Sequence, residues 1–340
     1  MRRWLSYHGR RLRQRLQAPA VVLLYHRVAE PDDTDVWQLA VSPACFAQHL
    51  QVLRQLGRVV PAAALAAPPL ALRRPRFAIT FDDGYLDNYT IAAPLLARHQ
   101  LPATFFAVAA GPDDAPEFWW DELAALVLLT DELPQVLDLG LASPWPAFDL
   151  AAEHRLTAAL RRQHQGWLAG LVPPPTRRAA LYYQLWQHLK LLPALAQQRW
   201  LQQLRSWAGQ LPAARPAYQR MAPAQLRELA EHPLFTIGAH TLSHPALASH
   251  SRAVQARELH GSRQALEAAT GQPVELLAYP YGNYGPETTA LAAQLGFAAA
   301  FTTCPQPLAH PTDPYQLGRF QVNNWSGEEF RRRLGQWLAR

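Results

Sequence analysis

Two groups of polar side chains in this 340-residue chain have the types and spacing that metal-assisted chemistry needs. The first is Asp82-Asp83-Gly84, in which two adjacent carboxylates precede a glycine that permits a tight turn. The second is His240 and His244, four residues apart, which we expect to lie on one helical turn and to face the same way. One carboxylate and two imidazoles suit a catalytic divalent ion, because three protein ligands leave positions open for water and substrate. The second carboxylate can then act as a base.

Each group alone has a simpler explanation. Asp-Asp-Gly is also typical of a solvated turn, and two histidines four residues apart can arise by chance in a chain that has 13. Two histidines and one carboxylate also describe non-haem Fe(II) oxygenases, but such a site would leave the second aspartate without a function. The two groups together favour a catalytic metal site.

The elements that must position these residues can be read from short apolar segments that end in polar or turn residues, as strands feeding loops do. Helical stretches lie between them, for example 43–56 with Ser42 as N-cap, and 252–269. Alternating strands and helices predict a mainly parallel α/β sheet, whose carboxyl-terminal edge holds the active site. The expected strands are 21–25, 77–81, 103–108, 234–237 and 274–278, and the residues at or just after their ends include His26, Asp82, Asp83, His240 and Tyr281.

The alternation of strands and helices breaks between residues 112 and 216. Proline-rich joints there separate segments whose apolar residues recur with helical period, such as Leu181, Leu185 and Leu189. We therefore expect a helical insertion at 112–216 within a barrel that spans 20–340, preceded by a basic tail at 1–19.

The motifs Thr80-Phe81-Asp82-Asp83-Gly84, His240 to Pro245 and Tyr279-Pro280-Tyr281-Gly282 resemble those of the polysaccharide deacetylases of the NodB-homology type, carbohydrate esterase family 4. The resemblance covers roughly residues 20–110 and 217–325, and 22–28 looks like the start of a bacterial subgroup. It implies an α/β fold, a distorted (β/α) barrel of the NodB-homology type with a helical insertion. It also implies a divalent metal, usually Zn²⁺, and a hydrolase that removes the N-acetyl group from an amino sugar or N-acetylated glycan.

The resemblance also assigns roles to residues of this chain. Asp83, His240 and His244 would be the metal ligands, and Asp82 would be the catalytic base. The backbone N–H of Tyr281 would stabilise the oxyanion of the tetrahedral intermediate, a contribution of about 3–4 kcal/mol in acyl-transfer enzymes.

Two features of the family are missing. Ala278 stands where the family carries an arginine that faces the base, and Arg27 or Arg319 could replace it on grounds of charge. The late histidine that serves as general acid is also absent, because the only histidine in the last 60 residues is His310, in a proline-rich loop. His26, at the end of the first strand, is the candidate proton donor, or else it closes a loop by hydrogen bonding.

Four residues beside these motifs are candidates for contacting substrate. Aromatic faces stack on sugar rings, but Trp119 could equally pack inside the insertion, and Trp325 could belong to a plain turn. The four candidates are Tyr85, Trp119, Pro280 and Trp325.

The net charge of +6 first suggests nucleic acid as a partner. Six arginines fall within the first nineteen residues, before any acidic residue, so the rest of the chain is neutral and we expect no nucleic-acid partner. The tail either forms a basic amphipathic helix on an anionic membrane or is a solubilising leader. With two cysteines and no apolar leader, we expect a cytoplasmic protein, peripheral to the inner face of the membrane if the tail binds lipid.

Two alternatives to an N-deacetylase stay open. The protein could be a non-catalytic sugar-binding protein that keeps the metal site, because the arginine and the general acid of the family are missing. It could also remove a formyl group from a lipid-linked amino sugar.

Overall fold

The computed structural model describes residues 20–66, 74–109, 117–139, 146–210, 215–308 and 312–339. The basic tail at 1–19 and His310 lie outside the described residues, so the predictions made for them are not addressed by the structure. Within the described residues, no helix combines the length and the apolar character needed to cross a bilayer. The chain divides into two compact units.

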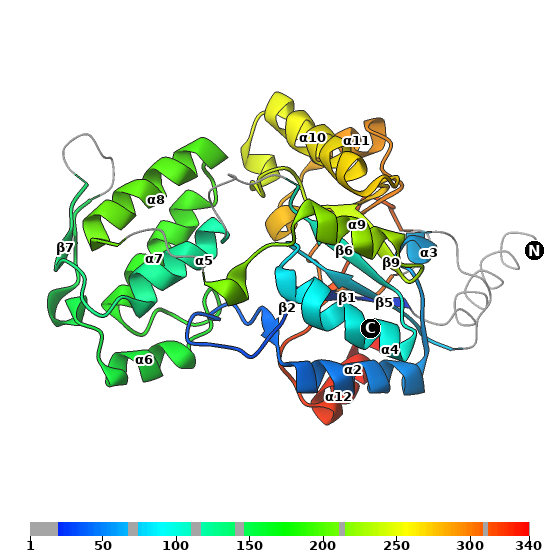
Figure 1. The fold of residues 1–340 in the computed structure, drawn as a ribbon, viewed down its shortest axis with the longest axis horizontal. Helices are drawn as coiled ribbons and strands as arrows, with labels where there is room; N and C mark the ends of the chain where they lie inside the picture. Colours follow the sequence, from blue (N-terminus) through cyan, green and yellow to red (C-terminus); the bar gives the residue numbers. More distant parts are fainter. Residues whose placement is uncertain are drawn as a thin grey trace, which may run out of the picture. The chain divides into compact units, whose positions relative to one another are not determined.

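The first unit contains, of the described residues, 20–29, 41–66, 74–109, 221–308 and 312–339, and it is built on one parallel sheet. The order of its strands is β11-β10-β9-β6-β5-β1-β12, with β4 added beside β5, and the sheet curls into a half-barrel (Figure 1). The predicted distorted (β/α) barrel is therefore confirmed. The strands are β1 (Ala20–Tyr25), β4 (Arg58–Val59), β5 (Arg76–Phe81), β6 (Ala103–Ala107), β9 (Phe235–Ala239), β10 (Leu276–Ala278), β11 (Ala299–Phe301) and β12 (Phe320–Gln321).

Helices cover the outer face of this sheet, with α2, α4 and α9 seen over it in Figure 1. The first begins as predicted, because the Ser42 hydroxyl accepts a hydrogen bond from the Cys45 N–H at 3.3 Å. These helices are α2 (Pro43–Leu56), α3 (Ala63–Ala66), α4 (Ala93–His99), α9 (Pro223–Glu231), α10 (Arg252–Thr270), α11 (Pro286–Gln294) and α12 (Gly327–Leu338). The unit also contains a π-helix, η1 (Asn88–Ala92), and the short 3₁₀ turns η5 (Leu247–Ser249) and η6 (Pro280–Gly282). Two short strands, β2 (Arg27–Val28) and β3 (Ala40–Val41), pair with each other.

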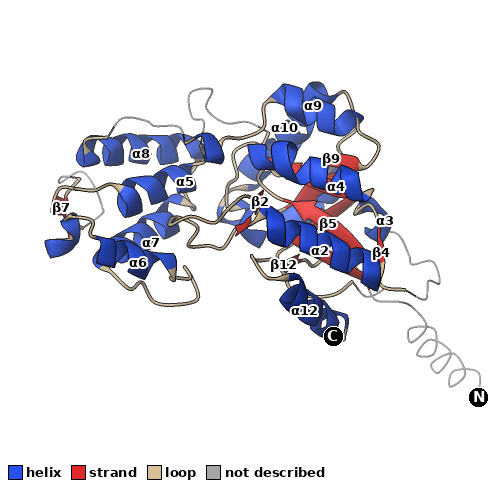
Figure 2. Ribbon diagram, turned by 60° about the horizontal axis from the view of Figure 1, so that its bottom comes forward, coloured by secondary structure: helices blue, strands red, loops and turns tan. Residues whose placement is uncertain are grey.

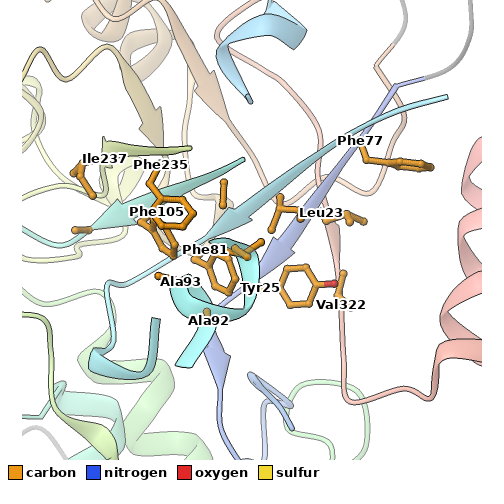
Figure 3. Packing of buried hydrophobic residues seen from close by; sticks show 14 of the residues in the cluster. Leu23, Tyr25, Phe77, Phe81, Ala92, Ala93, Phe105, Phe235, Ile237 and Val322 are labelled. Atoms are coloured by element: carbon orange, nitrogen blue, oxygen red, sulfur yellow. The ribbon is translucent and has the colours of Figure 1, made fainter. Parts of the chain in front are cut away.

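A row of aromatic rings on the helix side of the sheet fixes the strand register (Figure 3). Tyr25 pairs with Phe81 and Phe81 with Phe105 in neighbouring strands, and the ring centroids are 5.4 and 5.0 Å apart. Because side chains alternate along a strand, the residue after each ring points to the opposite, inner side of the half-barrel. Asp82 follows Phe81 and His26 follows Tyr25, so this packing places both at the carboxyl edge of the sheet.

The second unit contains 30–40 together with 117–139, 146–210 and 215–220, and it is mainly helical (Figure 2). Residues 30–40, which lie outside the predicted insertion, group with it because they pack and bond there: Trp37 Nε1 donates to the Tyr182 hydroxyl at 2.8 Å. Its elements are α5 (Trp119–Ala124), the π-helix η2 (Ala125–Leu129), β7 (Val136–Leu137), β8 (Phe148–Asp149), η3 (Ala151–His154), α6 (Ala158–Gln165), α7 (Arg177–Leu189), α8 (Ala194–Ala208) and η4 (Pro216–Tyr218).

Candidate metal centre

Three side chains predicted as metal ligands converge in the first unit. The Nε2 atoms of His240 and His244 are 3.2 Å apart, and they lie 3.5 and 3.4 Å from Asp83 Oδ1. A tetrahedral ion with bonds of about 2.1 Å would hold its ligand atoms about 3.4 Å from one another. All three side chains are buried. The residues present therefore fit a divalent cation.

The two histidines meet without the helical turn that their spacing suggested. His240 directly follows β9, and the loop from His240 to His244, called the ligand loop below, is irregular. Thr241 and His244 have φ angles of 67° and 60°, which a right-handed helix excludes. In place of a helical bond, the His244 N–H donates to the Thr241 hydroxyl at 3.0 Å. The prediction of a helical turn is therefore wrong, although both imidazoles face one point.

A hydrogen bond outside the ligand set fixes the tautomer of His240. Its Nδ1 lies 2.8 Å from the carbonyl oxygen of Ala278, a group that can only accept. The proton of the neutral ring is therefore on Nδ1. Nε2, beside Asp83 Oδ1 and His244, can then bind a cation, or without one it can take up a second proton and donate it to Asp83. A carbonyl or carboxylate partner of this kind is typical of histidines that bind metals.

The charges of the site keep its carboxylates ionised. Burial alone would raise the pKa of Asp83, but the hydrogen bond from His240 and the nearby imidazoles lower it to about 2. Burial and the neighbouring His240 lower the pKa of His244 to about 3, so this imidazole is neutral. Burial would also lower the pKa of His240, but Asp82 and Asp83 outweigh it and raise the pKa. The carboxylates that favour a proton on His240 equally favour a cation at this point.

Asp82 is held by a buried arginine. Arg319 Nη1 and Nη2 each donate to one oxygen of the Asp82 carboxylate at 2.6 Å, and Nη1 also donates to the Thr80 hydroxyl at 3.2 Å. Arg319 is fully buried, and its Nε donates to the Thr302 carbonyl at 3.0 Å. Burial would raise the pKa of Asp82, but the charge of Arg319 outweighs it and keeps the pKa low. Arg319 thus takes the place of the arginine that the resemblance implies at position 278, where this chain has an alanine.

The other candidate for that arginine has a different partner. Arg27 Nε donates to Asp87 at 3.1 Å, and its guanidinium lies 5.1 Å from the centroid of the Tyr85 ring. Asp87 also accepts from the Val28 N–H, and Asn88 donates to the His26 carbonyl. The suggestion that Arg27 faces the base is therefore wrong, and this pair instead fixes the end of β1.

The model of the polysaccharide deacetylase family matches residues 71–127 and 197–300, which include both predicted motif groups. The predicted resemblance to the polysaccharide deacetylases is therefore confirmed over these residues. The deacetylase match runs across β5, β6, β9, β10 and the ligand loop, which carry the three candidate ligands and Asp82. Arg319 lies beyond the matched residues.

Individual relatives agree with this assignment. The chain is 29% identical over 107 residues to YxkH of Bacillus subtilis (strain 168), whose name places it with the polysaccharide deacetylases; the match covers 31% of this chain and 38% of YxkH, well under two thirds of that protein. The solved structure of IcaB from Ammonifex degensii has a TM-score of 0.56 at 19% identity, covering 95% of this chain and 98% of IcaB. The Streptococcus pyogenes deacetylase PplD has a TM-score of 0.51 at 20% identity, with 95% and 98% covered. At these identities the two structures bear on the fold.

His26, the predicted proton donor, lies close enough to the candidate metal centre for the charges there to shift its pKa. His26 follows β1, is partly exposed, and feels the charges of Asp83, Asp82, Arg319 and His240. Burial lowers its pKa, although the two carboxylates act in the opposite direction. Whether His26 donates a proton stays a prediction.

Strained backbone is concentrated at this site. Asp83, Thr241, His244 and Tyr281 all adopt left-handed φ angles, between 57° and 72°. Each such residue costs of order 1–3 kcal/mol, which persists where function requires the conformation. Gly84, at φ 87°, completes the turn after Asp83 without such a cost. The Tyr281 ring lies edge-on to the His244 ring at 4.5 Å, so the turn after β10 borders the ligands.

The candidate substrate contacts lie in different places. Tyr85 and Pro280 are buried, at the turn after Asp83 and at the start of η6. Trp325 packs on Arg333 and Trp337 of α12, at 4.1 Å from the guanidinium and 6.1 Å between rings. Trp119 is buried in α5 of the second unit, where it packs on Trp120 and Trp186. Their contacts with substrate stay predictions.

Residues that sequence reasoning missed support the site from behind. The motif that contains Thr80 predicts no role for its hydroxyl, which accepts a hydrogen bond from Arg319. No motif includes Glu258 in α10, whose carboxylate accepts two hydrogen bonds from Ser243 of the ligand loop. Glu258 is nearly fully buried, and no spacing rule connects it with His244. A buried acid in an amphipathic helix was the one signal that could have indicated it.

Proposed function

We propose that this chain is a divalent-metal-dependent hydrolase that removes the N-acetyl group from an amino sugar of a glycan, with Zn²⁺ as its ion. The observation that carries the proposal is a buried carboxylate, Asp82, held ionised by Arg319 next to a cluster of three ligands. A structural site has no use for a fixed carboxylate that binds no ion, whereas hydrolysis needs a base there. The match to the polysaccharide deacetylase model supports the amide of an N-acetylated sugar as the bond cleaved.

The ion would be held by Asp83, His240 and His244. When bound, it would lower the pKa of a water from 15.7 towards about 7 and polarise the amide carbonyl. Asp82 accepts the proton of the attacking water, and Arg319 keeps Asp82 ionised and oriented for this step. Because both oxygens of Asp82 bond to Arg319, the carboxylate cannot rotate away.

Two further groups complete the reaction. The Tyr281 N–H, in the turn that borders His244, donates to the oxyanion as it develops. His26 donates a proton to the leaving amine. Because burial lowers its pKa, the ring is mostly neutral near pH 7, so it takes up the proton it donates during the reaction, from Asp82, which has removed one from the attacking water. The products are acetate and an amino sugar.

The test combines metal analysis of the purified chain with acetate release from N-acetylhexosamine oligomers and lipid-linked or nucleotide-linked N-acetyl sugars. We expect one Zn²⁺ per chain and release of acetate that is abolished in Asp82→Asn, with metal content unchanged. Asp313→Asn, an exposed aspartate far from the ligands in sequence, is the control and should keep full activity. Metal binding without acetate release from any substrate would support the non-catalytic alternative, and formate release would change the acyl group. Full activity of Asp82→Asn would refute the mechanism.

A further inference from the structure

The ligand loop is a strained segment between two ligands, so something outside it must hold its shape. Its backbone passes through left-handed φ angles at Thr241 and at His244 itself, neither of which is a glycine. Such conformations persist only where surrounding contacts over-determine them. The Thr241 hydroxyl supplies one contact inside the loop. The side chains of Leu242 and Ser243, between Thr241 and His244, contact α10.

The first contact is made by the Glu258 carboxylate, which accepts two hydrogen bonds from Ser243. Glu258 Oε2 accepts a hydrogen bond from the Ser243 backbone N–H at 2.9 Å, and Glu258 Oε1 accepts one from the Ser243 hydroxyl, also at 2.9 Å. Glu258 is 5% exposed, so water competes little for either oxygen. Two bonds from one carboxylate to the backbone and side chain of one residue fix both its position and its orientation.

The second contact, one helical turn further along α10, is steric. A Cβ atom at Gly261 would lie 2.5 Å from Leu242 Cδ1, closer than any real contact, so the Leu242 side chain occupies the place of the missing methyl group. A glycine inside a helix lowers helix stability. Positions 258 and 261 share one helix face. α10 therefore holds Leu242 and Ser243 side by side, directly between His240 and His244.

We propose that α10 is the element that preorganises the metal site, with Glu258 and Gly261 as positioning residues that set metal affinity through the ligand loop. The inference rests on the proposed metal-dependent function. It assigns to Glu258 no contact with ion or substrate. Partners that orient ligands are typically responsible for 10- to 100-fold in metal affinity. Loosening the loop would let His244 Nε2 leave its place 3.4 Å from Asp83 Oδ1.

The test measures zinc affinity of the metal-stripped full chain by competition with a chromophoric chelator. We expect Glu258→Leu to weaken zinc binding 10- to 100-fold, and Glu258→Gln, which can still bond to Ser243 through both of its polar atoms, to weaken it less. Glu267→Leu is the matched control in the same helix, since Glu267 bonds to Arg263 and the Val274 N–H, away from the loop. The visible spectrum of bound Co²⁺ should change in Glu258→Leu and stay unchanged in the control.

The steric contact gives a second, independent variant. Gly261→Ala should weaken zinc binding less than Glu258→Leu does, because the Leu242 side chain can turn aside, and the bulkier Gly261→Val should weaken it more. Gly335→Ala in α12, where a Cβ would meet nothing within 4 Å, should raise Tm and leave zinc affinity unchanged. If Glu258→Leu fails to fold, the zinc affinities of Gly261→Ala and Ser243→Ala test the role of α10 in its place. With acetate release measured at saturating zinc, the positioning variants should recover most activity.

Three outcomes separate the hypotheses. Wild-type zinc affinity in folded Glu258→Leu and Gly261→Ala would overturn the role of α10 and leave the proposed function intact. A wild-type chain that binds neither Zn²⁺ nor Co²⁺ would overturn both. Weakened zinc binding in the variants, with the controls unchanged, supports the inference even if no substrate has been found.

Discussion

Replacing Arg319 by methionine removes the partner of Asp82, the proposed base, while keeping much of the buried volume. In the native chain, two hydrogen bonds of 2.6 Å join the guanidinium to Asp82, and neither side chain is more than 3% exposed. Without Arg319, burial becomes the dominant influence on Asp82 and raises its pKa. A base that is protonated at the assay pH cannot accept the proton of water, and each unit of pKa above that pH costs tenfold in rate.

The magnitudes follow from these contacts. Breaking a buried ion pair by removing one partner costs about 3–5 kcal/mol. For a unit of this size, a loss of 1 kcal/mol lowers Tm by about 2–4 °C, so Arg319→Met should melt about 6–20 °C lower. A positioned base contributes about 10²–10⁴-fold, so kcat for acetate release should fall at least about 100-fold, with the acid limb of the pH–rate profile shifted to higher pH. Arg319→Lys keeps the charge but cannot bond to both oxygens of Asp82 in the same way, so its kcat should lie between those of the wild type and Arg319→Met.

The control is Arg263→Met, which removes another arginine–carboxylate pair from the same unit, with Glu267 at 2.9 Å. It should lower Tm without shifting the acid limb. The assay is acetate release across pH 5 to 9 at a temperature below the Tm of every variant. A folded Arg319→Met variant with wild-type kcat and an unmoved acid limb would show that Arg319 does not hold the base.

Two further perturbations test stability. His49, buried in α2 between the Tyr25 hydroxyl and the Trp325 carbonyl, has a pKa lowered by burial from 6.5 to about 4. Because the folded pKa is depressed, its contribution is present above pH 6.5 and is lost as pH falls towards 4. Urea unfolding should thus show about 2 kcal/mol more loss between pH 7 and 4.5 in wild type than in His49→Gln; equal losses would contradict this. Arg178, fully buried, donates to the carbonyls of Val127, Thr130 and others, so Arg178→Met should lower the free energy of unfolding by at least about 3 kcal/mol, with zinc binding by the first unit retained.

Local sequence patterns predicted the scaffold of this site because its determinants are local. Apolar segments ending at Tyr25, Phe81 and near Ala239 are strands in the structure, with the polar residues at one edge of a parallel sheet. The rule that parallel strands present their carboxyl ends together is enough to bring Asp83 near His240. The convergence of Asp83, His240 and His244 could therefore be predicted from the sequence.

The conformation of the ligand loop could not be predicted in the same way. The spacing of His240 and His244 suggested a helical turn, because that is the usual way for residues four apart to face together. The structure reaches the same convergence by strained φ angles at Thr241 and His244. In that conformation the loop bonds to Glu258, which is fourteen residues beyond His244 on another element. Tertiary contacts decided the backbone here, and no local propensity encodes them.

The position of the arginine shows the same principle at the level of the barrel. Ala278 and Leu317 belong to one cluster on the inner face of the half-barrel, together with Phe106, and the Arg319 guanidinium lies 5.5 Å from the Phe106 ring. A side chain at 278 or one at 319 can thus reach the same interior, although the two are 41 positions apart along the chain. The chemistry requires only that a guanidinium meet both oxygens of Asp82. On charge alone, either Arg27 or Arg319 could face Asp82. The structure decides for Arg319, because the chain just before β12 directs this side chain into the half-barrel.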